Sequence, residues 1–339
     1  MATTALALAD ILDARRRMEG VATLDTPLVP SPFLSEVAGR DVFLKLEIAQ
    51  ATGAFKLRGA ANAVALLPPE TEGVTCCSTG NHGRGVAYAA AKRGLRAVIC
   101  MSTLVPKAKV EGIRALGAEV CIAGKSQDEA QAESERLVRE EGLTEIAPFD
   151  ALPVIAGQGT IGLELMEQRP DLETVLIPLS GGGLAGGVAF ALKRIKPSIR
   201  VIGITMDRGA AMHAALQAGR PAEVTEVESL ADSLGGGIGV DNRYSFSLCR
   251  DCLDDVVLVT EEEIYRAMQA HYYEDRIVCE GASAVGAAAL MAGKLGVVKG
   301  PLATIITGRN VDMAVYTDIV NGRDVQLGDY LLKGAAYVA

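Results

Sequence analysis

Lys56 is the residue of this 339-residue sequence whose position first suggests chemistry. It lies in the segment TGAFKLRGA (52–60), directly after an aromatic residue. Burial works against the charged form of a lysine, so such a side chain either reaches solvent or is kept as a neutral amine for use. A neutral ε-amine is both a nucleophile toward aldehydes and a general base. Lys56 is therefore a candidate catalytic residue.

Two glycine-marked turns and one strand end are candidate binding elements. The segments STGNHG (78–83) and SGGGLAGG (180–187) each follow a predicted strand and open a predicted helix. Backbone N–H groups at a helix start bind carboxylates and phosphates, and glycine lets an anion approach the backbone. A simple helix cap by Thr79 or Asn81 is the alternative for the first turn. The hydroxyl of Thr307, in TIITGRNVDM (304–313), could bond a ligand but alone indicates no more than a turn.

The second turn also satisfies a dinucleotide-binding pattern. Gly181, Gly183 and Gly186 match G-x-G-x-x-G, and Asp207 follows 21 residues after Gly186. This spacing is typical of nicotinamide-dependent dehydrogenases, although the motif alone is weakly specific. It leaves Lys56 and the turn at 78–82 without a role. A non-catalytic ligand-binding module is a further alternative.

Pyridoxal phosphate is one cofactor that would use all of these features. Its aldehyde condenses with a lysine, its phosphate needs a glycine-rich helix start, and its ring needs a partner at the pyridine nitrogen. An amino-acid substrate brings the carboxylate for the remaining turn. We therefore expect pyridoxal phosphate as the cofactor and a small amino acid as the substrate.

The ordered segments resemble the fold-type II pyridoxal-phosphate enzymes, specifically the serine/threonine dehydratase and serine racemase family. The resemblance covers about residues 8–320 and implies two α/β domains, as in the tryptophan synthase β fold. Four segments most resemble the hydroxyectoine-utilisation dehydratase branch. They are TGAFKLRGA, CMSTLVPKAK, RGAAMHAALQAGRP and ADSLGGGIGVDNRYSF.

The resemblance implies a role for each candidate residue. Lys56 would be the Schiff-base lysine, with Phe55 beside the ring. Asn81 would bond the ring 3-hydroxyl, Thr307 would face the pyridine nitrogen, and Glu280 in CEGASAV would lie near the ring. The substrate carboxylate would be received by Ser78, Thr79, Gly80 and His82, and the phosphate by Ser180, Gly181, Gly182, Gly183 and Leu184.

The implied reaction is the dehydration of a β-hydroxy amino acid of the L-threonine or L-serine type. Lys56 would remove the Cα proton, the β-hydroxyl would leave as water, and a 2-oxo acid and ammonia would result. A neutral hydroxyl at Thr307 favours prompt elimination over transamination. Another substrate, such as 3-hydroxyaspartate or a hydroxyectoine breakdown product, stays open. Family members are often homodimers.

Four positions depart from the family pattern. Thr79 replaces the serine that racemases use as a base opposite the lysine, so it keeps a catalytic hydroxyl but puts racemisation in doubt. Thr205 replaces a glutamate metal ligand, and we expect no metal, although Asp207 lies near. Arg84 and Arg309 replace a common glutamine and glycine, and either could pair with an acidic group of the substrate.

Alternating strand-like and helix-like segments begin at about residue 74 and predict parallel sheets covered by helices. We expect strands at 74–79, 96–101, 119–124, 174–180 and 200–206. The prediction is a large cofactor-binding domain (1–72 and 149–322), an inserted small domain (73–148) and a C-terminal tail (323–339). Only 27 residues follow Asp312, so no regulatory domain is expected there.

Composition excludes several classes of protein. Hydrophobic residues make up 49% and charged residues 22%, as in soluble globular proteins. A net charge of −9 argues against binding nucleic acid or anionic membranes. The amphipathic start MATTALALADILDARRR is no signal peptide, and no apolar run reaches the roughly 18 residues of a membrane span, which favours a cytoplasmic protein. Seven irregularly spaced cysteines predict reduced, mostly buried thiols, with no zinc site at Cys249 and Cys252.

Overall fold

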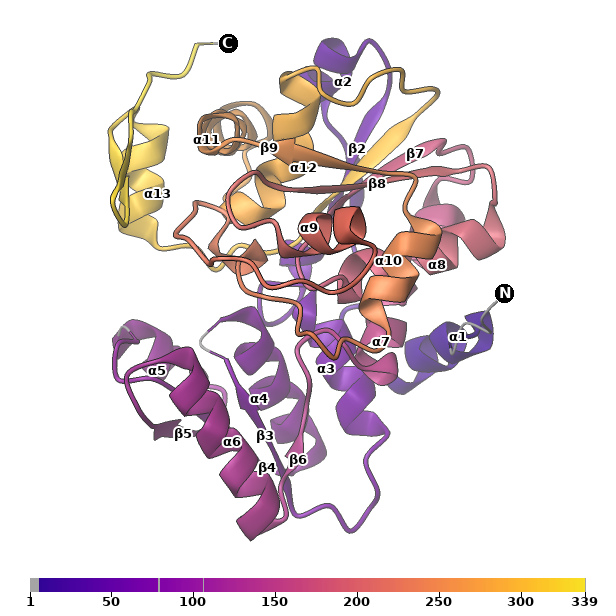
Figure 1. Cartoon of the computed structure of the whole chain (residues 1–339). Coiled ribbons are helices and arrows are strands. Elements are labelled where there is room, and N and C mark those ends of the chain that lie inside the picture. The colour runs from indigo at the N-terminus through magenta and orange to yellow at the C-terminus, as the bar shows by residue number, and fades with distance from the viewer. Residues whose placement is uncertain (1–5, 79, 106, 339) are drawn as a thin grey trace.

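Two largely parallel sheets carry the chain in a computed structural model that describes residues 6–78, 80–105 and 107–338 (Figure 1). The larger has the strand order β1–β2–β10–β7–β8–β9, and only β1 runs antiparallel to its neighbour. The smaller has the order β5–β4–β3–β6 and is parallel throughout. The predicted α/β class is confirmed. The strands are β1 (Leu28–Pro30), β2 (Val42–Leu46), β3 (Gly73–Cys77), β4 (Arg96–Met101), β5 (Glu119–Ile122), β6 (Thr144–Glu145), β7 (Thr174–Pro178), β8 (Arg200–Met206), β9 (Asp255–Val259) and β10 (Leu302–Ile306).

Helices cover both sheets and begin and end where local sequence signals place them. In α6, for example, Ser126 and Glu129 form a capping box, and Gly142 ends the helix with a φ of 67°. The amphipathic N-terminal helix that the sequence predicts is α1. The helices are α1 (Leu8–Arg17), α2 (Pro32–Ala38), α3 (Lys56–Ala65), α4 (Asn81–Arg93), α5 (Lys107–Arg114), α6 (Gln127–Glu141), α7 (Leu152–Gln168), α8 (Gly183–Ile195), α9 (Ala211–Ala218), α10 (Ser245–Cys252), α11 (Glu261–Ala270), α12 (Gly281–Met291) and α13 (Met313–Val320).

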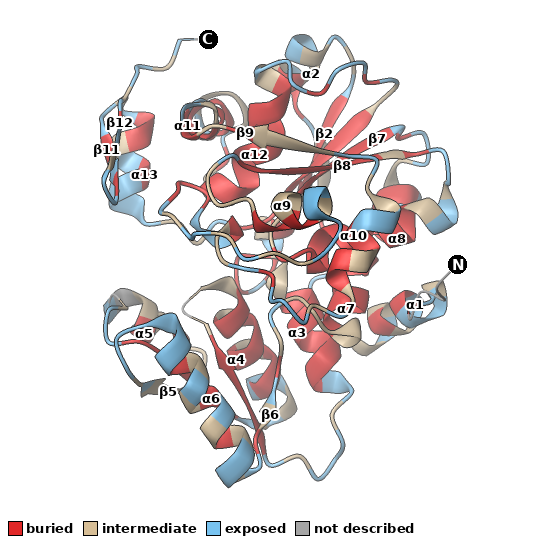
Figure 2. Ribbon diagram, viewed as in Figure 1, coloured by how far each residue is buried: buried red, intermediate tan, exposed pale blue. Residues whose placement is uncertain are grey.

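The larger sheet is buried on both faces, so its strands are apolar throughout. Successive side chains of a strand enter different cores: Leu176 belongs to the core beneath α11 and α12, whereas Val175 and Ile177 belong to the core beneath α8. Figure 2 shows α7, α8 and α12 as mostly buried ribbons. This double covering fixes the carboxyl ends of β7 and β10 relative to one another.

The smaller sheet packs on α3 and α4 through one core and on α6 through another. Leu57, Ala60 and Val64 of α3 belong to the first of these cores, although α3 precedes residue 73 in the chain. All four strands of this sheet lie within the predicted small domain. The exact domain boundaries stay a prediction.

The segment predicted as a tail forms a hairpin of β11 (Val325–Leu327) and β12 (Tyr330–Leu332). Its side chains Val325, Leu327 and Leu332 are buried in the core of the larger unit. All seven cysteines are free, and five of them are buried, as expected of reduced thiols. Within the described part of the chain, no helix is long and apolar enough to cross a membrane.

Candidate active site

Lys56 lies at the start of α3, directly beside the carboxyl end of β10. The backbone N–H of Phe55 donates to the carbonyl of Thr307 at 2.9 Å, and Ala54 forms a β-bridge with Gly308. The Lys56 ammonium donates to the carbonyl of Pro148 at 2.7 Å. Burial lowers the pKa of Lys56 to about 8. Lys56 as a whole is half-buried, so its amine is partly desolvated and more easily neutralised than that of an exposed lysine.

The glycine loop after β7 approaches Lys56 through the segment Pro148–Phe149. A Cβ on Gly181 would lie 2.5 Å from the ring of Phe149, and one on Gly183 would lie 2.7 Å from the Phe149 carbonyl oxygen. Gly182 has a φ of 86°, in the left-handed region that favours glycine. The sequence of this loop is thus required by its geometry, and the loop lies one residue away from the carbonyl that binds Lys56.

Two helix starts at this site lack side-chain caps within the described residues. α8 begins after Gly182 and α4 begins after Gly80, and neither has a capping hydrogen bond from a side chain. Uncapped N–H groups at the positive end of a helix favour an anion. Ser180 and Ser78 are half-buried beside these two starts, and Leu184 is buried in the first turn of α8. The Gly80 N–H just before α4 donates to the Ser78 hydroxyl at 3.3 Å, whereas among the described residues the first turns of α4 and α8 have no side-chain cap, as the two predicted anion cradles require.

Asn81, at the start of α4, is tied across to the larger unit. Its amide nitrogen donates to both carboxylate oxygens of Glu280 at 3.0 and 2.9 Å, and its oxygen accepts from Asn310 at 2.7 Å. Glu280 also accepts from the Asn310 backbone N–H and from the Ser233 hydroxyl. Burial raises the pKa of Glu280, while these donors oppose that rise. This network orients Asn81 and joins four separate segments of the chain.

His82 is buried beneath the same helix start. Its Nε2 donates to the carbonyl of Ile146 at 2.7 Å, and its Nδ1 has no partner among the described residues. Burial and then the charge of Lys56 lower the pKa of His82 to about 3, so the ring is neutral at physiological pH. A neutral ring with its one N–H committed cannot donate to a carboxylate. The predicted carboxylate contact is therefore better served by backbone N–H groups, and Thr79 lies outside the described residues.

Thr307 is buried at the end of β10. Its Oγ1 lies 2.9 Å from the hydroxyl oxygen of Ser283, in the first turn of α12. A Cβ on Gly308 would lie 2.4 Å from Glu280, so glycine is required directly after Thr307. The four elements that the sequence predicts to meet, at Lys56, 78–82, 180–184 and Thr307, are therefore joined by direct contacts or by one intervening residue.

Comparison with known proteins decides the family. The model of the pyridoxal-phosphate dependent enzyme family matches residues 21–308. The chain belongs to the pyridoxal-phosphate dependent enzymes. It is 54% identical to a putative threonine dehydratase of Sinorhizobium fredii, over 94% of this chain and 96% of the relative. It is 40% identical to an L-threonine ammonia-lyase of Thermotoga maritima, over 95% of this chain and 80% of that one.

Solved structures agree with this assignment to the pyridoxal-phosphate dependent enzymes. Maize serine racemase superposes with a TM-score of 0.87 at 32% identity, covering 91% of this chain and 95% of its own. Threonine deaminase isoform 2 of Solanum lycopersicum gives a TM-score of 0.86 at 35% identity, covering 93% of this chain and 91% of its own. The predicted fold-type II architecture and the serine/threonine dehydratase-like family are thereby confirmed. The hydroxyectoine branch stays a prediction.

The residues of this pyridoxal-phosphate dependent enzyme suit the cofactor. A desolvated amine, an uncapped glycine-rich helix start and a buried neutral hydroxyl are the three groups that its aldehyde, phosphate and pyridine nitrogen require. Lys56 would hold the aldehyde carbon, residues 180–184 the phosphate, and Thr307 the nitrogen. The β7–α8–β8 unit could also suit a dinucleotide, but the family match overturns the dehydrogenase alternative.

The sequence analysis missed a buried charge network that fixes the start of α3. Arg58 donates to Glu47 through Nε and to Glu164 through an end nitrogen, at 2.8 and 2.6 Å, and Lys45 lies 2.6 Å from Glu164. All four side chains are fully buried. Burial opposes ionisation of Glu164, yet Arg58 and Lys45 lower its pKa to about 2. In the sequence, the one feature that indicates this buried network is an arginine two residues after Lys56.

Other predicted features lie apart from these contacts. The Arg84 side chain packs against Gly112 of α5, and the Arg309 side chain packs over Gly53. Thr205 is buried and donates to Met206, and within the described residues no group of three or more His, Cys, Asp or Glu could hold a metal ion. Pairing of either arginine with an acidic group of the substrate stays a prediction.

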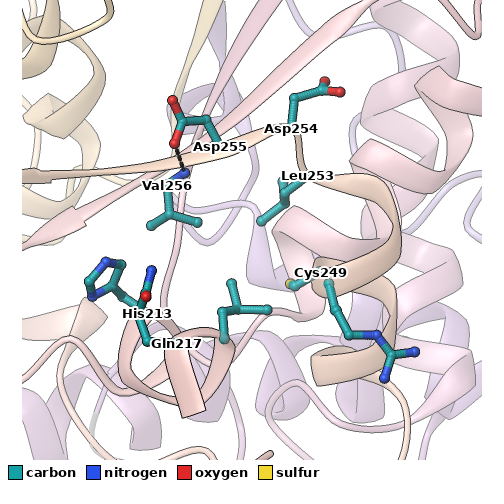
Figure 3. A pocket seen from close by; sticks show the side chains of 9 residues that line it. His213, Gln217, Cys249, Leu253, Asp254, Asp255 and Val256 are labelled. Atoms are coloured by element: carbon teal, nitrogen blue, oxygen red, sulfur yellow. Dashed lines mark hydrogen bonds between the residues drawn. The ribbon is translucent and has the colours of Figure 1, made fainter. Parts of the chain in front are cut away.

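A shallow pocket of about 290 Å³ opens elsewhere, between α9, α10 and β9 (Figure 3). His213, Gln217 and Asp254 are among the polar residues that line it. It meets the site only indirectly, through Cys249, whose thiol donates to the carbonyl of Gly182 at 3.6 Å. None of the predicted site residues lines this pocket.

Proposed function

We propose that this pyridoxal-phosphate dependent enzyme is an ammonia-lyase that dehydrates L-threonine and L-serine to a 2-oxo acid and ammonia. The position of Lys56 carries the proposal, because its amine bonds to Pro148, whose neighbour Phe149 packs on the glycine loop, and has a pKa of about 8. The 54% identity to a putative threonine dehydratase over nearly the whole chain supports this choice of substrate class.

The chain itself supplies a base for the Cα proton. With a pKa of about 8, roughly a tenth of Lys56 is neutral at pH 7, compared with roughly one molecule in three thousand at the ordinary value of 10.5. When bound, pyridoxal phosphate supplies the electron sink that makes the substrate Cα–H bond acidic. Lys56 Nζ would take that proton and return it to the departing β-hydroxyl, which leaves as water. The amides at the start of α4 would orient the substrate carboxylate.

Thr307 directs the outcome toward elimination. A hydroxyl is neutral and does not stabilise a cationic nitrogen as a carboxylate would. Negative charge at the substrate Cα is then stabilised less strongly, so loss of the β-hydroxyl competes well against slower reactions. Glu280, the nearest buried carboxylate in these contacts, is bonded to Asn81, Asn310 and Ser233 instead of Thr307.

The test combines labelling with a substrate panel. Borohydride reduction of the cofactor-loaded protein should place the cofactor mass on Lys56, and ammonia should be released from L-threonine and L-serine but not from L-alanine. Lys56→Ala should lower the rate roughly a hundred- to ten-thousandfold. Lys92→Ala, at an exposed lysine of α4, is the matched control and should keep wild-type activity. A label on another lysine, or ammonia released only from 3-hydroxyaspartate, would reject the proposal.

We also propose that the enzyme is a cytoplasmic homodimer acting in amino-acid or hydroxyectoine catabolism. The family resemblance supports the dimer, and the absence of a membrane-spanning helix among the described residues is compatible with a soluble enzyme. Light scattering on the purified chain measures the first point directly. A monomeric mass at working concentration would contradict the dimer.

A further inference from the structure

Ser283 is a buried hydroxyl directly behind Thr307 that the reaction described above does not use. It lies in the first turn of α12 and is fully buried. Its Oγ lies 2.9 Å from Thr307 Oγ1, where either hydroxyl could donate, accepts from the Gly308 N–H at 2.8 Å and is placed to donate to the Gly308 carbonyl oxygen at 2.9 Å. One hydroxyl therefore contacts three polar atoms at the end of β10.

Counting hydrogens limits what this cluster can do. The Ser283 hydroxyl has one hydrogen, which it can donate in a hydrogen bond either to the Gly308 carbonyl or to the Thr307 hydroxyl. If it goes to the carbonyl, Thr307 must donate to Ser283 and can only accept from a ligand. If it goes to Thr307, the Thr307 hydrogen is free to point at the ligand. The Gly308 carbonyl stays paired in either case, because the Glu280 N–H donates to it at 3.0 Å.

Burial chooses between the two arrangements. Thr307 is almost fully buried, and a buried site disfavours a cationic partner that no opposite charge stabilises. The pyridine nitrogen of a bound cofactor would then be unprotonated and could only accept a hydrogen bond. Thr307 must donate to it, which requires Ser283 to donate to Thr307.

We propose that Ser283 is a positioning residue that turns the Thr307 hydroxyl into a donor toward the pyridine nitrogen of the cofactor. The inference rests on the proposed function, because it needs the cofactor ring to lie against Thr307. Two hydroxyls in series also strengthen one another, so the terminal bond is stronger than a single threonine would make. Ser283 thereby favours the unprotonated ring and the elimination described above.

A double-mutant cycle on cofactor binding tests the pairing without any turnover. Ser283→Ala should raise the dissociation constant of pyridoxal phosphate roughly fivefold, the effect of one typical hydrogen bond. In a Thr307→Val background, where no donor is left to orient, Ser283→Ala should cause no further loss. Equal losses in both backgrounds would show that Ser283 only supports the backbone of Gly308, and would overturn the proposal.

The nitrogen itself gives the second readout. In wild-type protein loaded with cofactor labelled with ¹⁵N in the ring, the resonance should be that of an unprotonated, hydrogen-bonded nitrogen. It should shift toward the unbonded position in Ser283→Ala, and less in Ser283→Cys, which keeps a weak donor and guards against misfolding of the alanine variant. A protonated nitrogen in the wild type would overturn the assignment.

The chain offers a matched control in Ser134. It is also fully buried, and its hydroxyl lies 3.2 Å from that of Thr75, in the smaller unit. Ser134→Ala should leave both the cofactor affinity and the nitrogen resonance unchanged, whereas a change equal to that of Ser283→Ala would overturn the pairing. If L-threonine proves not to be a substrate, the proposed function fails, but the titration and the resonance still decide the role of Ser283.

Discussion

At the scale of single residues, His82 shows how burial changes a predicted role. Its residue type and place in a glycine-marked turn suggest a donor for the substrate carboxylate. In the structure its N–H is committed to Ile146, and burial holds the pKa near 3. We infer that His82 ties the strand ending at 145 to the start of α4, and that it positions the turn that carries Asn81.

This tie predicts a pH dependence of stability. His82 has a pKa of about 6.5 in the unfolded chain and about 3 in the folded chain. Between these two pH values the unfolded chain binds one more proton than the folded chain, which favours unfolding. The contribution of His82 to the free energy of unfolding is therefore fully present above pH 6.5 and is smaller by about 2 kcal/mol at pH 5. His82→Gln keeps an N–H for Ile146 and does not titrate. Urea unfolding at pH 7 and pH 5 should therefore show about 2 kcal/mol more loss in the wild-type apoprotein, and equal losses would contradict the tie.

At the scale of elements, α3 is fixed by charge as well as by packing. Arg58 and Lys45 pair with two carboxylates, those of Glu47 and Glu164. All four side chains are fully buried, and the two positive charges are balanced by two negative ones. Gly59 lets α7 approach closely, because a Cβ there would lie 2.4 Å from Gln158. Lys56 is in the first turn of this anchored helix, and the network therefore sets the position of its amine.

Glu164→Gln should break the network at one partner. It leaves two buried cations with one carboxylate, and removing one member of a buried pair costs about 3–5 kcal/mol. Glu167→Gln is the matched control on the same helix, because Glu167 is exposed and pairs with Arg15 at the surface. That change should cost less than about 1 kcal/mol. Chemical unfolding at pH 7 measures the free energy of unfolding of both variants. Similar decreases would show that the buried network stabilises the protein no more than the surface pair does.

The sequence predicts the elements of this fold better than the contacts between them. Strands β4 and β8 have the bounds that the sequence predicts, 96–101 and 200–206, and the turn chemistry at 180–183 indicates the start of α8 correctly. Arg58 is visible beside Lys56, but its partners lie 11 and 106 residues away, and only the folded chain brings them together. The Ser283–Thr307 pair is hidden for the same reason, because no local pattern joins α12 to the end of β10.

At the scale of the whole molecule, the site is assembled from both sheets. The start of α4 belongs to the unit of the smaller sheet, whereas α8 and β10 belong to the larger one. Asn81 and Glu280 already connect the two across their junction. A cofactor held by the α8 start and bonded by Asn81 would add a second connection. Its binding should therefore stabilise both units together.

Removal of pyridoxal phosphate tests this connection. Binding at a hundredfold excess over the dissociation constant stabilises a protein by about 2.7 kcal/mol, so the apoprotein should melt several degrees lower. Amide hydrogen exchange should slow near residues 182–184 when pyridoxal phosphate binds, since its phosphate would cover those N–H groups, and near residues 80–83 when L-alanine, which has no β-hydroxyl to lose, is added as well. Lys56→Ala should keep part of this protection, because the phosphate contacts do not need the covalent bond. No slowing near residues 80–83 with cofactor and L-alanine both present would show that the turn at 78–82 does not bind the substrate carboxylate.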